Sequence, residues 1–289
     1  MEKYDLLKTQ LLYEGTASKD QFISPAQLAD SICQLTHDSQ YLDALNKQSL
    51  TKQEIRQSGF PLSTALIRRE KIIAEGTRLV AIHALNDQIA FNIAGGTHHA
   101  NRSQAQGFCL LNDQAIAANY LMAQDLAERI LIIDLDVHQG NGTAEIFKED
   151  KSVFTFSMHG NNNFPFRKAS SNLDVGLADQ TEDELYLKLL KVNLKLIERS
   201  FCFDYVFYQA GVDVLANDKL GRLSLSVAGC KMRDEMVLKF AQKHQTPICI
   251  SMGGSYNIHM REIIEAHSNT FRLANKLYEF DYKTNRHQL

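Results

Sequence analysis

Short apolar runs alternate along the chain with longer segments in which apolar residues recur at helical spacing. The apolar runs are typical of buried strands and lie at 90–94, 130–136, 153–157, 204–209 and 247–252. Helical periodicity is clearest in Leu111–Leu126, Glu182–Arg199 and Met232–His244. Residues 257–279 are expected to form the final helix. Strands that alternate with helices predict an α/β fold, a three-layer α/β/α architecture with a central parallel sheet.

The whole chain is expected to form a single domain. It has 289 residues, of which 44% are hydrophobic, and this is enough to bury a large core. No linker, repeat or low-complexity tract divides it. Asp281–Leu289 is expected to be a loose tail.

Charge and cysteine usage narrow the function classes. The formal net charge is −3 and no block of Lys and Arg occurs, so nucleic acid is not expected as a direct ligand. The five cysteines are odd in number and form no Cys-x-x-Cys pair, which favours a reducing compartment. No apolar run is long enough to cross a membrane and no signal-peptide pattern is visible, so a cytoplasmic location is expected.

Polar side chains follow the apolar run at 130–133. Asp134, Asp136 and His138 alternate with apolar residues, and period-two geometry sends them to the same side of the strand. Because open parallel sheets bind ligands at the carboxyl ends of their strands, these groups predict a cation site there. The alternative is a strand followed by an ordinary capped polar turn.

Three more predicted strands are followed by residues that could bind a metal or take part in catalysis. His98 and His99 follow a glycine turn, Asp213 follows the run at 204–209, and Tyr256 follows the last run through two glycines. Histidine binds metals and moves protons near neutral pH. Groups of this kind at four strand ends predict an active site.

These motifs resemble the zinc-dependent histone deacetylase and acetylpolyamine amidohydrolase superfamily, which has the arginase-deacetylase fold. The resemblance runs from about Met1 to Tyr278 and implies one deacetylase-like catalytic domain over residues 1–289. The motifs that carry it are Gly95–Ala100, Gly107–Cys109, Asp134–Gly142, Ser157–His159, Ala210–Leu215 and Gly253–Tyr256. Asn163–Lys168 and Asp218–Leu223 are closer to the bacterial, class IV-like branch.

The resemblance implies two cation sites. One catalytic Zn²⁺ would be held by Asp136, His138 and Asp213, a donor set that leaves a coordination position open for water and substrate. A monovalent cation such as K⁺ would be held by oxygen atoms. Its expected ligands are Asp134, Asp136, His138, Ser157 and Met158.

The resemblance also assigns catalytic roles. His99 would be the general base and acid, and His98, held by Asp134, would be its electrostatic partner. Asn141 stands where many relatives have an aspartate, so it would orient His99 without adding charge and leave the His99 pKa lower. Tyr256 would stabilise the oxyanion. For each side chain the alternative is an ordinary buried residue.

A narrow apolar channel is the third implied feature. Its expected lining residues are Gly107, Phe108, Phe164, Leu220 and Gly254. An apolar tube suits the methylene stem of an acylated lysine or polyamine. Relatives usually have a strand before the segment that Met1–Leu7 resembles. Either the true start lies upstream, or this version lacks that edge strand, and its loss is expected to weaken acetate release or solubility.

The expected function is zinc-dependent amide hydrolysis by metal-activated water, removing acetyl or longer acyl groups from the ε-amine of lysine in proteins or peptides. Deacetylation of an acetylpolyamine or another small amide is the alternative within this chemistry. Two other classes compete: an arginase-like binuclear manganese hydrolase, which would need further ligands, and a non-catalytic module that binds acyl chains. The oligomeric state stays open.

Overall fold

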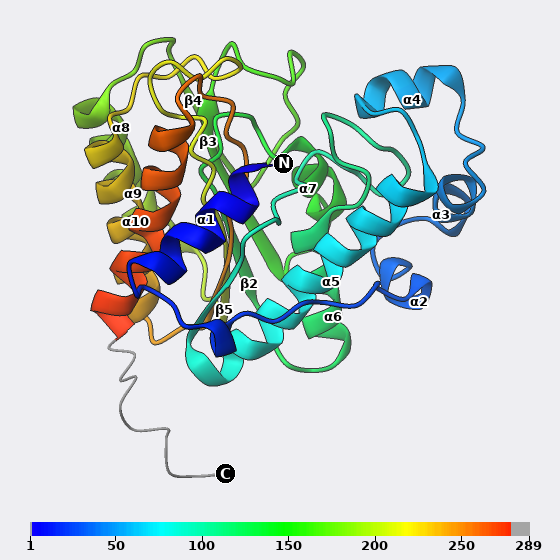
Figure 1. Cartoon of the computed structure of the whole chain (residues 1–289), viewed down its shortest axis with the longest axis horizontal. Helices are drawn as coiled ribbons and strands as arrows, with labels where there is room; N and C mark the ends of the chain where they lie inside the picture. The colour runs from blue at the N-terminus through cyan, green and yellow to red at the C-terminus, as the bar shows by residue number, and fades with distance from the viewer. Residues whose placement is uncertain (1, 279–289) are drawn as a thin grey trace.

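The computed structural model describes residues 2–278, which form one six-stranded sheet covered by helices (Figure 1). All strands are parallel and lie in the order β1-β6-β5-β2-β3-β4. The strands are β1 Ile89–Asn92, β2 Ile130–Asp134, β3 Val153–Gly160, β4 Leu173–Leu177, β5 Tyr205–Gln209 and β6 Ile248–Ser251. The tail expected at 281–289 lies outside the described residues.

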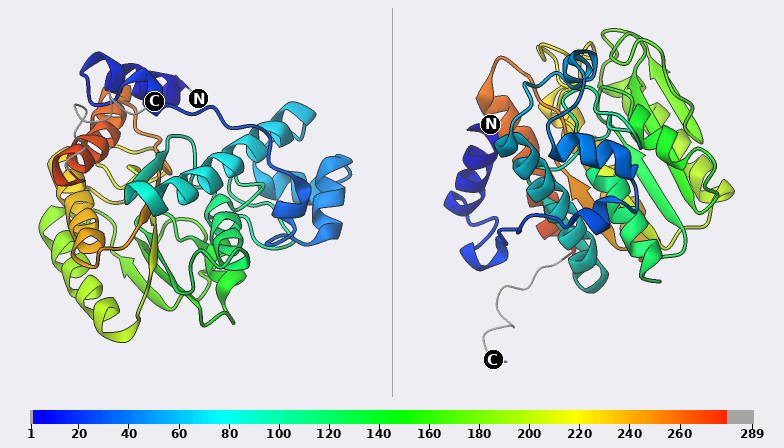
Figure 2. Two further views of the ribbon diagram at one scale, coloured as in Figure 1. Left: turned by 90° about the horizontal axis from the view of Figure 1, so that it is seen from below. Right: turned by 90° about the vertical axis from the view of Figure 1, so that its right-hand side faces the viewer.

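Two helical layers enclose this sheet (Figures 1 and 2), which confirms the predicted three-layer α/β/α architecture. One layer contains α1 Glu2–Tyr13, α8 Asp183–Ser200, α9 Val227–Lys243 and α10 Met260–Tyr278. The other contains α5 Thr64–Asp87, α6 Asp113–Ala123 and α7 Asn141–Phe147. Three short helices extend beyond α5, namely α2 Asp30–Cys33, α3 Ser39–Asn46 and α4 Lys52–Ser58, and a 3₁₀ turn η1 spans Lys19–Gln21.

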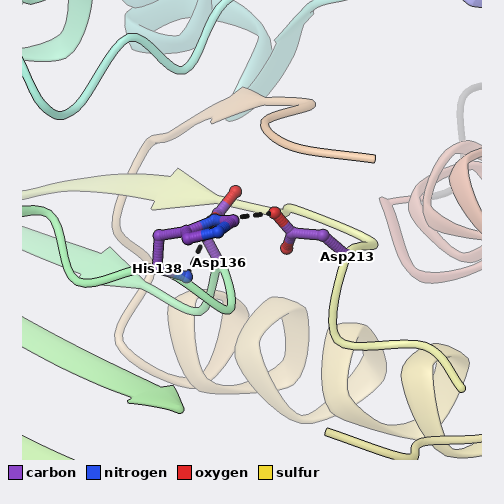
Figure 3. A group of neighbouring side chains, drawn as sticks. All are labelled: Asp136, His138 and Asp213. Carbon is purple, nitrogen blue, oxygen red and sulfur yellow. Dashed lines mark hydrogen bonds and ion pairs between the residues drawn. The ribbon is translucent and has the colours of Figure 1, made fainter. Parts of the chain in front are cut away.

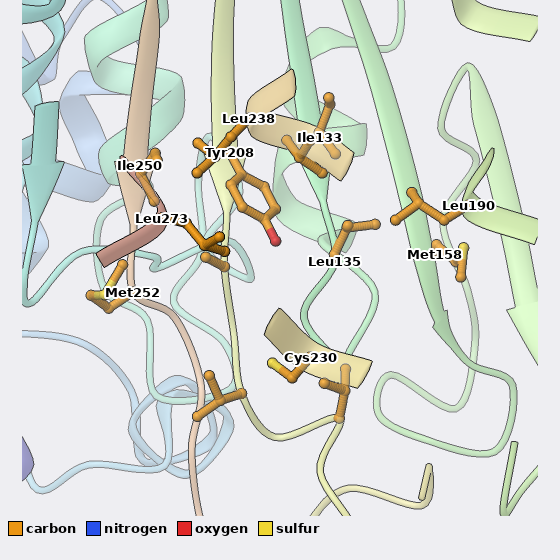
Figure 4. Close-up of a cluster of buried hydrophobic side chains, with 14 of the residues drawn as sticks. Ile133, Leu135, Met158, Leu190, Tyr208, Cys230, Leu238, Ile250, Met252 and Leu273 are labelled. Atoms are coloured by element: carbon orange, nitrogen blue, oxygen red, sulfur yellow. The ribbon is translucent and has the colours of Figure 1, made fainter. Parts of the chain in front are cut away.

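The core is built from alternate faces of the strands. In β2, Ile133 (Figure 4) and Leu131 pack with the α8–α10 layer, whereas Ile130 and Ile132 pack with α5 and α6. Every residue of β2 is buried. Burial on both faces explains why the central strands appear in the sequence as continuous apolar runs.

Several elements were not predicted from the sequence, among them β4 and α5. β4 is an edge strand in which Leu173 and Val175 alternate with the exposed Asp174 and Gly176, so it has no continuous apolar run. The 24-residue helix α5 buries mostly small or polar residues, and this weakens its apolar periodicity. The remaining predicted helices and strands occur with ends shifted by a few residues.

The register of the sheet sets a row of polar residues along its carboxyl edge. Asp134 lies between Ser157 of β3 and Gln209 of β5, and Gln209 in turn lies beside Ser251 of β6. The segments that follow these strands therefore meet at one edge, and they contain the candidate site. Among residues 2–278, no helix is long and apolar enough to cross a membrane.

Candidate active site

Asp136, His138 and Asp213 converge at this edge of the sheet (Figure 3). The two loops that carry them follow β2 and β5. One potential ligand atom from each residue lies within 4.8 Å of the others, and all three side chains are buried. His138 Nδ1 is 3.1 Å from Asp136 Oδ1 and 3.2 Å from Asp213 Oδ2. In the described part of the chain, this is the one group of three or more His, Cys, Asp or Glu side chains with such geometry.

The surroundings of these residues fit a cation. Asp213 Oδ2 is buried, and apart from its ion-pair contact with His138 it accepts no hydrogen bond from the described residues. A Cβ at Gly254 would lie 2.0 Å from this oxygen and 2.8 Å from Asp136 Oδ2, so glycine leaves room for both carboxylates. Burial would lower the pKa of His138, but Asp136 and Asp213 raise it to about 10. The site therefore favours positive charge.

A buried arginine fixes both loops that carry these residues. Arg233 Nη1 in α9 donates to the carbonyl of Leu135 at 3.2 Å and to that of Gly211 at 2.6 Å. Its charge is compensated by Asp234, whose Oδ1 is 2.8 Å from Arg233 Nη2. Arg233 therefore ties together the loops after β2 and β5.

His98 and His99 lie beside the candidate metal site, and each forms a hydrogen bond with its own side-chain partner. His98 Nδ1 is 2.7 Å from Asp134 Oδ2, and His99 Nδ1 is 2.7 Å from Asn141 Oδ1. The two rings have centroids 4.1 Å apart. Asp134 thus faces His98 and is not part of the cluster formed by Asp136, His138 and Asp213.

The two histidines differ in their protonation. Burial would lower the pKa of His98, but the carboxylates of Asp134 and Asp136 raise it to about 9. Burial lowers the pKa of His99 well below its usual range, and the neighbouring His98 and His138 add to this effect. His98 therefore favours the imidazolium form and His99 the neutral form.

Gln106 completes the His99 pair and could not be identified from the sequence. Asn141 Nδ2 donates to Gln106 Oε1 at 2.7 Å, so Asn141 Oδ1 is left to accept from His99 Nδ1–H. This arrangement leaves His99 Nε2 as an acceptor. Gln106 carries no spacing or motif signal, since its partner is 35 residues away.

Asp113, in the first turn of α6, holds the turn that delivers both histidines. Its Oδ2 accepts from the N–H of Gly96 at 2.9 Å, and its Oδ1 accepts from the N–H of Thr97 at 2.8 Å. Gly96 has φ +109°, a conformation that glycine adopts without steric cost. Asp113 was not identified from the sequence, because its contacts join two separate segments of the chain.

Tyr256 lies beside His138 at the carboxyl end of β6. The rings are nearly perpendicular, with centroids 6.5 Å apart, and the tyrosine is 37% exposed. Burial raises its pKa, and Asp213 and Asp136 raise it further. The phenol is therefore held in its protonated form.

Two of the predicted channel residues, Gly107 and Phe164, lie against His99. The Phe164 ring meets the His99 ring edge-on at 5.0 Å, and a Cβ at Gly107 would be 2.6 Å from His99 Cδ2. Phe108 is 44% exposed and has φ +65°. Leu220 is also 44% exposed, and its carbonyl accepts from Asn163, the neighbour of Phe164.

Phe60, which follows α4, was not predicted as a site residue, but it supports the expected channel residue Phe108. Its ring packs edge-on against Phe108 with centroids 5.3 Å apart. The Phe108 N–H donates to the carbonyl of Ser58 at 2.9 Å. The lobe formed by α2, α3 and α4 therefore positions Phe108, one of the expected channel residues.

The expected K⁺ ligands lie next to the candidate metal site. Asp134 and Ser157 are register partners on β2 and β3. Ser157 Oγ is 2.9 Å from Nδ1 of His159, whose pKa is lowered to about 4 by burial. Occupation by a monovalent cation stays a prediction.

Comparisons with known proteins point to one family. The family profile described as "Histone deacetylase domain" matches residues 1–271. An uncharacterized protein of Picosynechococcus is 40% identical over 279 residues, covering 96% of this chain and 93% of that protein. Histone deacetylase 2 of Arabidopsis thaliana is 28% identical, covering 85% of this chain and 66% of its own. Acetoin utilization protein AcuC of Staphylococcus aureus is 28% identical, covering 92% and 74%.

Solved structures show the same fold. An HDAC homolog from Aquifex aeolicus has a TM-score of 0.76 at 23% identity, covering 93% of this chain and 82% of that one. An HDAC homolog complexed with SAHA has the same TM-score at 24% identity, with the same coverage. The profile spans most of the sequence, and the relative at 40% identity spans nearly its full length. The chain therefore belongs to the histone deacetylase family.

Proposed function

We propose that this protein is a zinc-dependent deacylase that removes acetyl or longer acyl groups from the ε-amine of lysine in proteins or peptides. Family membership supports a deacetylase hydrolase. The observation that carries the proposal is the buried Asp136–His138–Asp213 group beside the two histidines and Tyr256. Side chains that could bind a metal ion and side chains that could transfer protons thus share one site.

Asp136, His138 and Asp213 would hold the zinc ion. Two carboxylates and one imidazole are the donor types that catalytic zinc sites use, with a further position left open. When bound, Zn²⁺ would act as a Lewis acid toward the acyl carbonyl and lower the pKa of water toward about 7. We also propose that K⁺ occupies the neighbouring oxygen-rich site at Asp134 and Ser157.

His99 is the proposed proton carrier. Its neutral form has a free acceptor at Nε2, because Nδ1 is engaged with Asn141. It would take the proton from the attacking water and pass it to the leaving amine. His98, held by Asp134 at 2.7 Å, would keep its positive charge and help stabilise the developing oxyanion.

Tyr256 is the proposed hydrogen-bond donor to the acyl oxygen. Its raised pKa keeps the hydroxyl protonated, as this role requires. The donor would become most effective as negative charge develops on that oxygen, so its contribution should appear in kcat.

The apolar wall of Phe108, Phe164 and Leu220 supports a substrate with a long neutral stem. Acyl-lysine and acylated polyamines both have such a stem next to the amide. We favour acyl-lysine because Phe108, Phe164 and Leu220 offer no negative charge to pair with the distal ammonium of a polyamine. The five free cysteines, four of them buried, support a reducing, cytoplasmic setting.

Other classes fit the site less well. A binuclear manganese site would need additional ligands, and the described residues contain one three-residue group suited to a metal. A non-catalytic acyl-binding module would not require the His99–Asn141–Gln106 chain of hydrogen bonds.

A substrate panel tests the proposal. The zinc-loaded chain would be assayed on peptides carrying ε-acetyl-, ε-octanoyl- and ε-dodecanoyl-lysine, and on monoacetylated putrescine and spermidine. We expect turnover of at least one acyl-lysine peptide at a higher kcat/KM than either polyamine. Faster turnover of a polyamine would reassign the substrate, and no turnover of any amide would refute the deacylase.

A further inference from the structure

A cleft of about 390 Å³ opens beside the residue that orients the proposed catalytic base. Its walls come from residues 101–103, from α7 and from residues 167–169. Asn141, the partner of His99, also lines it. None of the expected channel residues is among the described residues that line this cleft, so it is distinct from the expected acyl channel.

The charges around the cleft are mostly positive and unpaired. Arg102, Arg167 and Lys168 line it together with one carboxylate, Glu145, which leaves two positive charges in excess. Arg102 and Lys168 donate to main-chain carbonyls, and none of the three cations forms an ion pair within the described part of the chain. Arg167 is exposed and has no hydrogen-bond partner there either. Because the chain as a whole has a formal charge of −3, this local excess favours an anion as the ligand of the cleft.

The walls of the cleft are fixed by the fold. Gln139 Nε2 donates to the carbonyl of Ala169 at 2.9 Å, and the Ala169 N–H donates to Gln139 Oε1 at 2.8 Å. Gln139 is fully buried, so this pair ties residues 167–169 to the loop before α7. On the other wall, Arg102 Nη2 donates to the carbonyl of Ile146 in α7 at 2.8 Å. The main chain around the cleft is therefore ordered in advance, which lowers the cost of binding a ligand.

Asn141 adds a hydrogen-bond donor to the cleft. Its Nδ2 has two N–H groups. One donates to Gln106 Oε1 at 2.7 Å, and the other has no acceptor among the described residues. Arginine presents its N–H groups in a planar fork that matches the oxygen atoms of a carboxylate or a phosphate. The cleft thus combines positive charge with donors suited to an oxyanion.

From these observations we infer that the cleft binds an oxyanion, a carboxylate or a phosphate group, between Arg102, Arg167 and Asn141. Two sources share this chemistry: a free anion, and an acidic or phosphorylated side chain that flanks the acyl-lysine of a substrate. A bound oxyanion accepts the second N–H of Asn141 and so fixes the amide that orients His99. This link to turnover rests on the proposed deacylase function, whereas binding itself does not.

Calorimetric titration of the full zinc-loaded chain with inorganic phosphate, at constant ionic strength, tests the site directly. We expect saturable binding in wild type. Arg167→Gln should weaken the affinity at least about tenfold, because a charge-assisted hydrogen bond is lost. Glu145→Gln should strengthen it about twofold, because the one carboxylate lining the cleft is removed. Phosphate held by the zinc ion would respond to neither substitution, so equal affinities in these three proteins, or no binding, would overturn the inference.

Arg199→Gln is the matched control. Arg199 is exposed on α8, in the opposite helical layer, and its substitution changes the net charge by the same amount as Arg167→Gln. The phosphate affinity of this variant should equal that of wild type. A loss as large as that in Arg167→Gln would assign the effect to the overall charge of the protein and would overturn the site.

Peptide substrates distinguish the two sources of the oxyanion. Acyl-lysine peptides with a flanking glutamate or phosphoserine would be compared with their glutamine and serine counterparts. If the oxyanion belongs to the substrate, the acidic peptides should have a kcat/KM about tenfold higher, and Arg167→Gln should abolish this preference. If it is a free anion, the peptides should react alike, and phosphate should change kcat with the midpoint found by calorimetry.

Turnover and binding can fail separately in these experiments. Phosphate binding without either effect on turnover would overturn the link between the cleft and His99. If no acyl-lysine peptide is hydrolysed, the deacylase proposal fails while the calorimetric comparison still decides whether the oxyanion site exists. If the enzyme is active but Arg167→Gln binds phosphate as wild type does, the oxyanion site fails and the deacylase proposal stands.

Discussion

His99 Nδ1 and Asn141 Oδ1 are 2.7 Å apart, so an uncharged amide orients the proposed catalytic base. Asn141 is itself held by Gln106, which prevents the amide from presenting its Nδ2 donor to the ring. An aspartate at this position would favour the imidazolium form, whereas asparagine does not. Burial and the nearby histidines already lower the pKa of His99. The wild-type arrangement thus keeps the base neutral well into the acidic range.

Asn141→Asp should consequently move the acidic limb of the kcat/KM profile to higher pH. The new carboxylate raises the pKa of His99, so a larger fraction is protonated and inactive as a base at a given pH. The measurement is kcat/KM on an acyl-lysine peptide across the acidic limb at equal zinc occupancy. A limb that stays in place or moves to lower pH would show that another group controls the profile.

Tyr256→Phe should retain the fold and the metal but lower kcat by about 10²–10³, the range for losing one oxyanion donor. Steady-state kinetics on an acetyl-lysine peptide, together with zinc analysis, measures this change. An unaltered kcat would remove the Tyr256 hydroxyl from the mechanism.

Gly254→Ala should weaken zinc binding, because its Cβ would lie 2.0 Å from Asp213 Oδ2 and displace that carboxylate. The affinity is measured by competition with a chromophoric chelator. Gly176→Ala, on the exposed edge strand β4, is the matched control, since its Cβ would meet only the Asn161 side chain at 3.0 Å or more. Equal zinc affinities in the two variants would argue against the assigned geometry.

The Glu14–Arg272 ion pair should make a pH-dependent contribution to the free energy of unfolding. The hydrogen bond from Arg272 lowers the pKa of Glu14 from 4.5 to about 2. A depressed carboxyl pKa stabilises the fold above pH 4.5, and this contribution is lost as pH falls toward 2. Because both side chains of the pair remain partly exposed to solvent, Glu14→Gln should cost about 1 kcal/mol or less at pH 7.

Chemical denaturation at pH 7 and at pH 3 measures the free energies of unfolding for this comparison. The difference between wild type and Glu14→Gln should shrink at the lower pH. A difference that stays constant would assign the effect to packing of the side chain, not to its charge.

The central part of the fold could be predicted because β2, β5 and β6 are buried on both faces and appear as continuous apolar runs. β4 could not, because an edge strand is covered on one side and its exposed positions interrupt the pattern. Helix α5 was not recognised because Ala74, Thr77 and Ala81 form its buried face, and small or polar residues give little apolar contrast.

The sequence located the candidate site through strand ends, since Asp136, His138 and Asp213 all follow buried strands. The residues that orient this site were not visible in the same way. Gln106 and Arg233 make their contacts across 35 and 98 residues, and neither has a local pattern that predicts such partners. Sequence periodicity reports which face a residue occupies, but not which distant segment packs against it.

The most direct test of the central claim is the turnover of an acyl-lysine peptide as Zn²⁺ is added back to metal-stripped protein. The account predicts negligible turnover without metal and a rise that saturates at about one equivalent, as expected for a single catalytic ion with three protein ligands. Asp213→Ala should show no such rise, because its loss leaves two ligands. Full turnover by the stripped protein, or an unchanged titration in Asp213→Ala, would contradict the account.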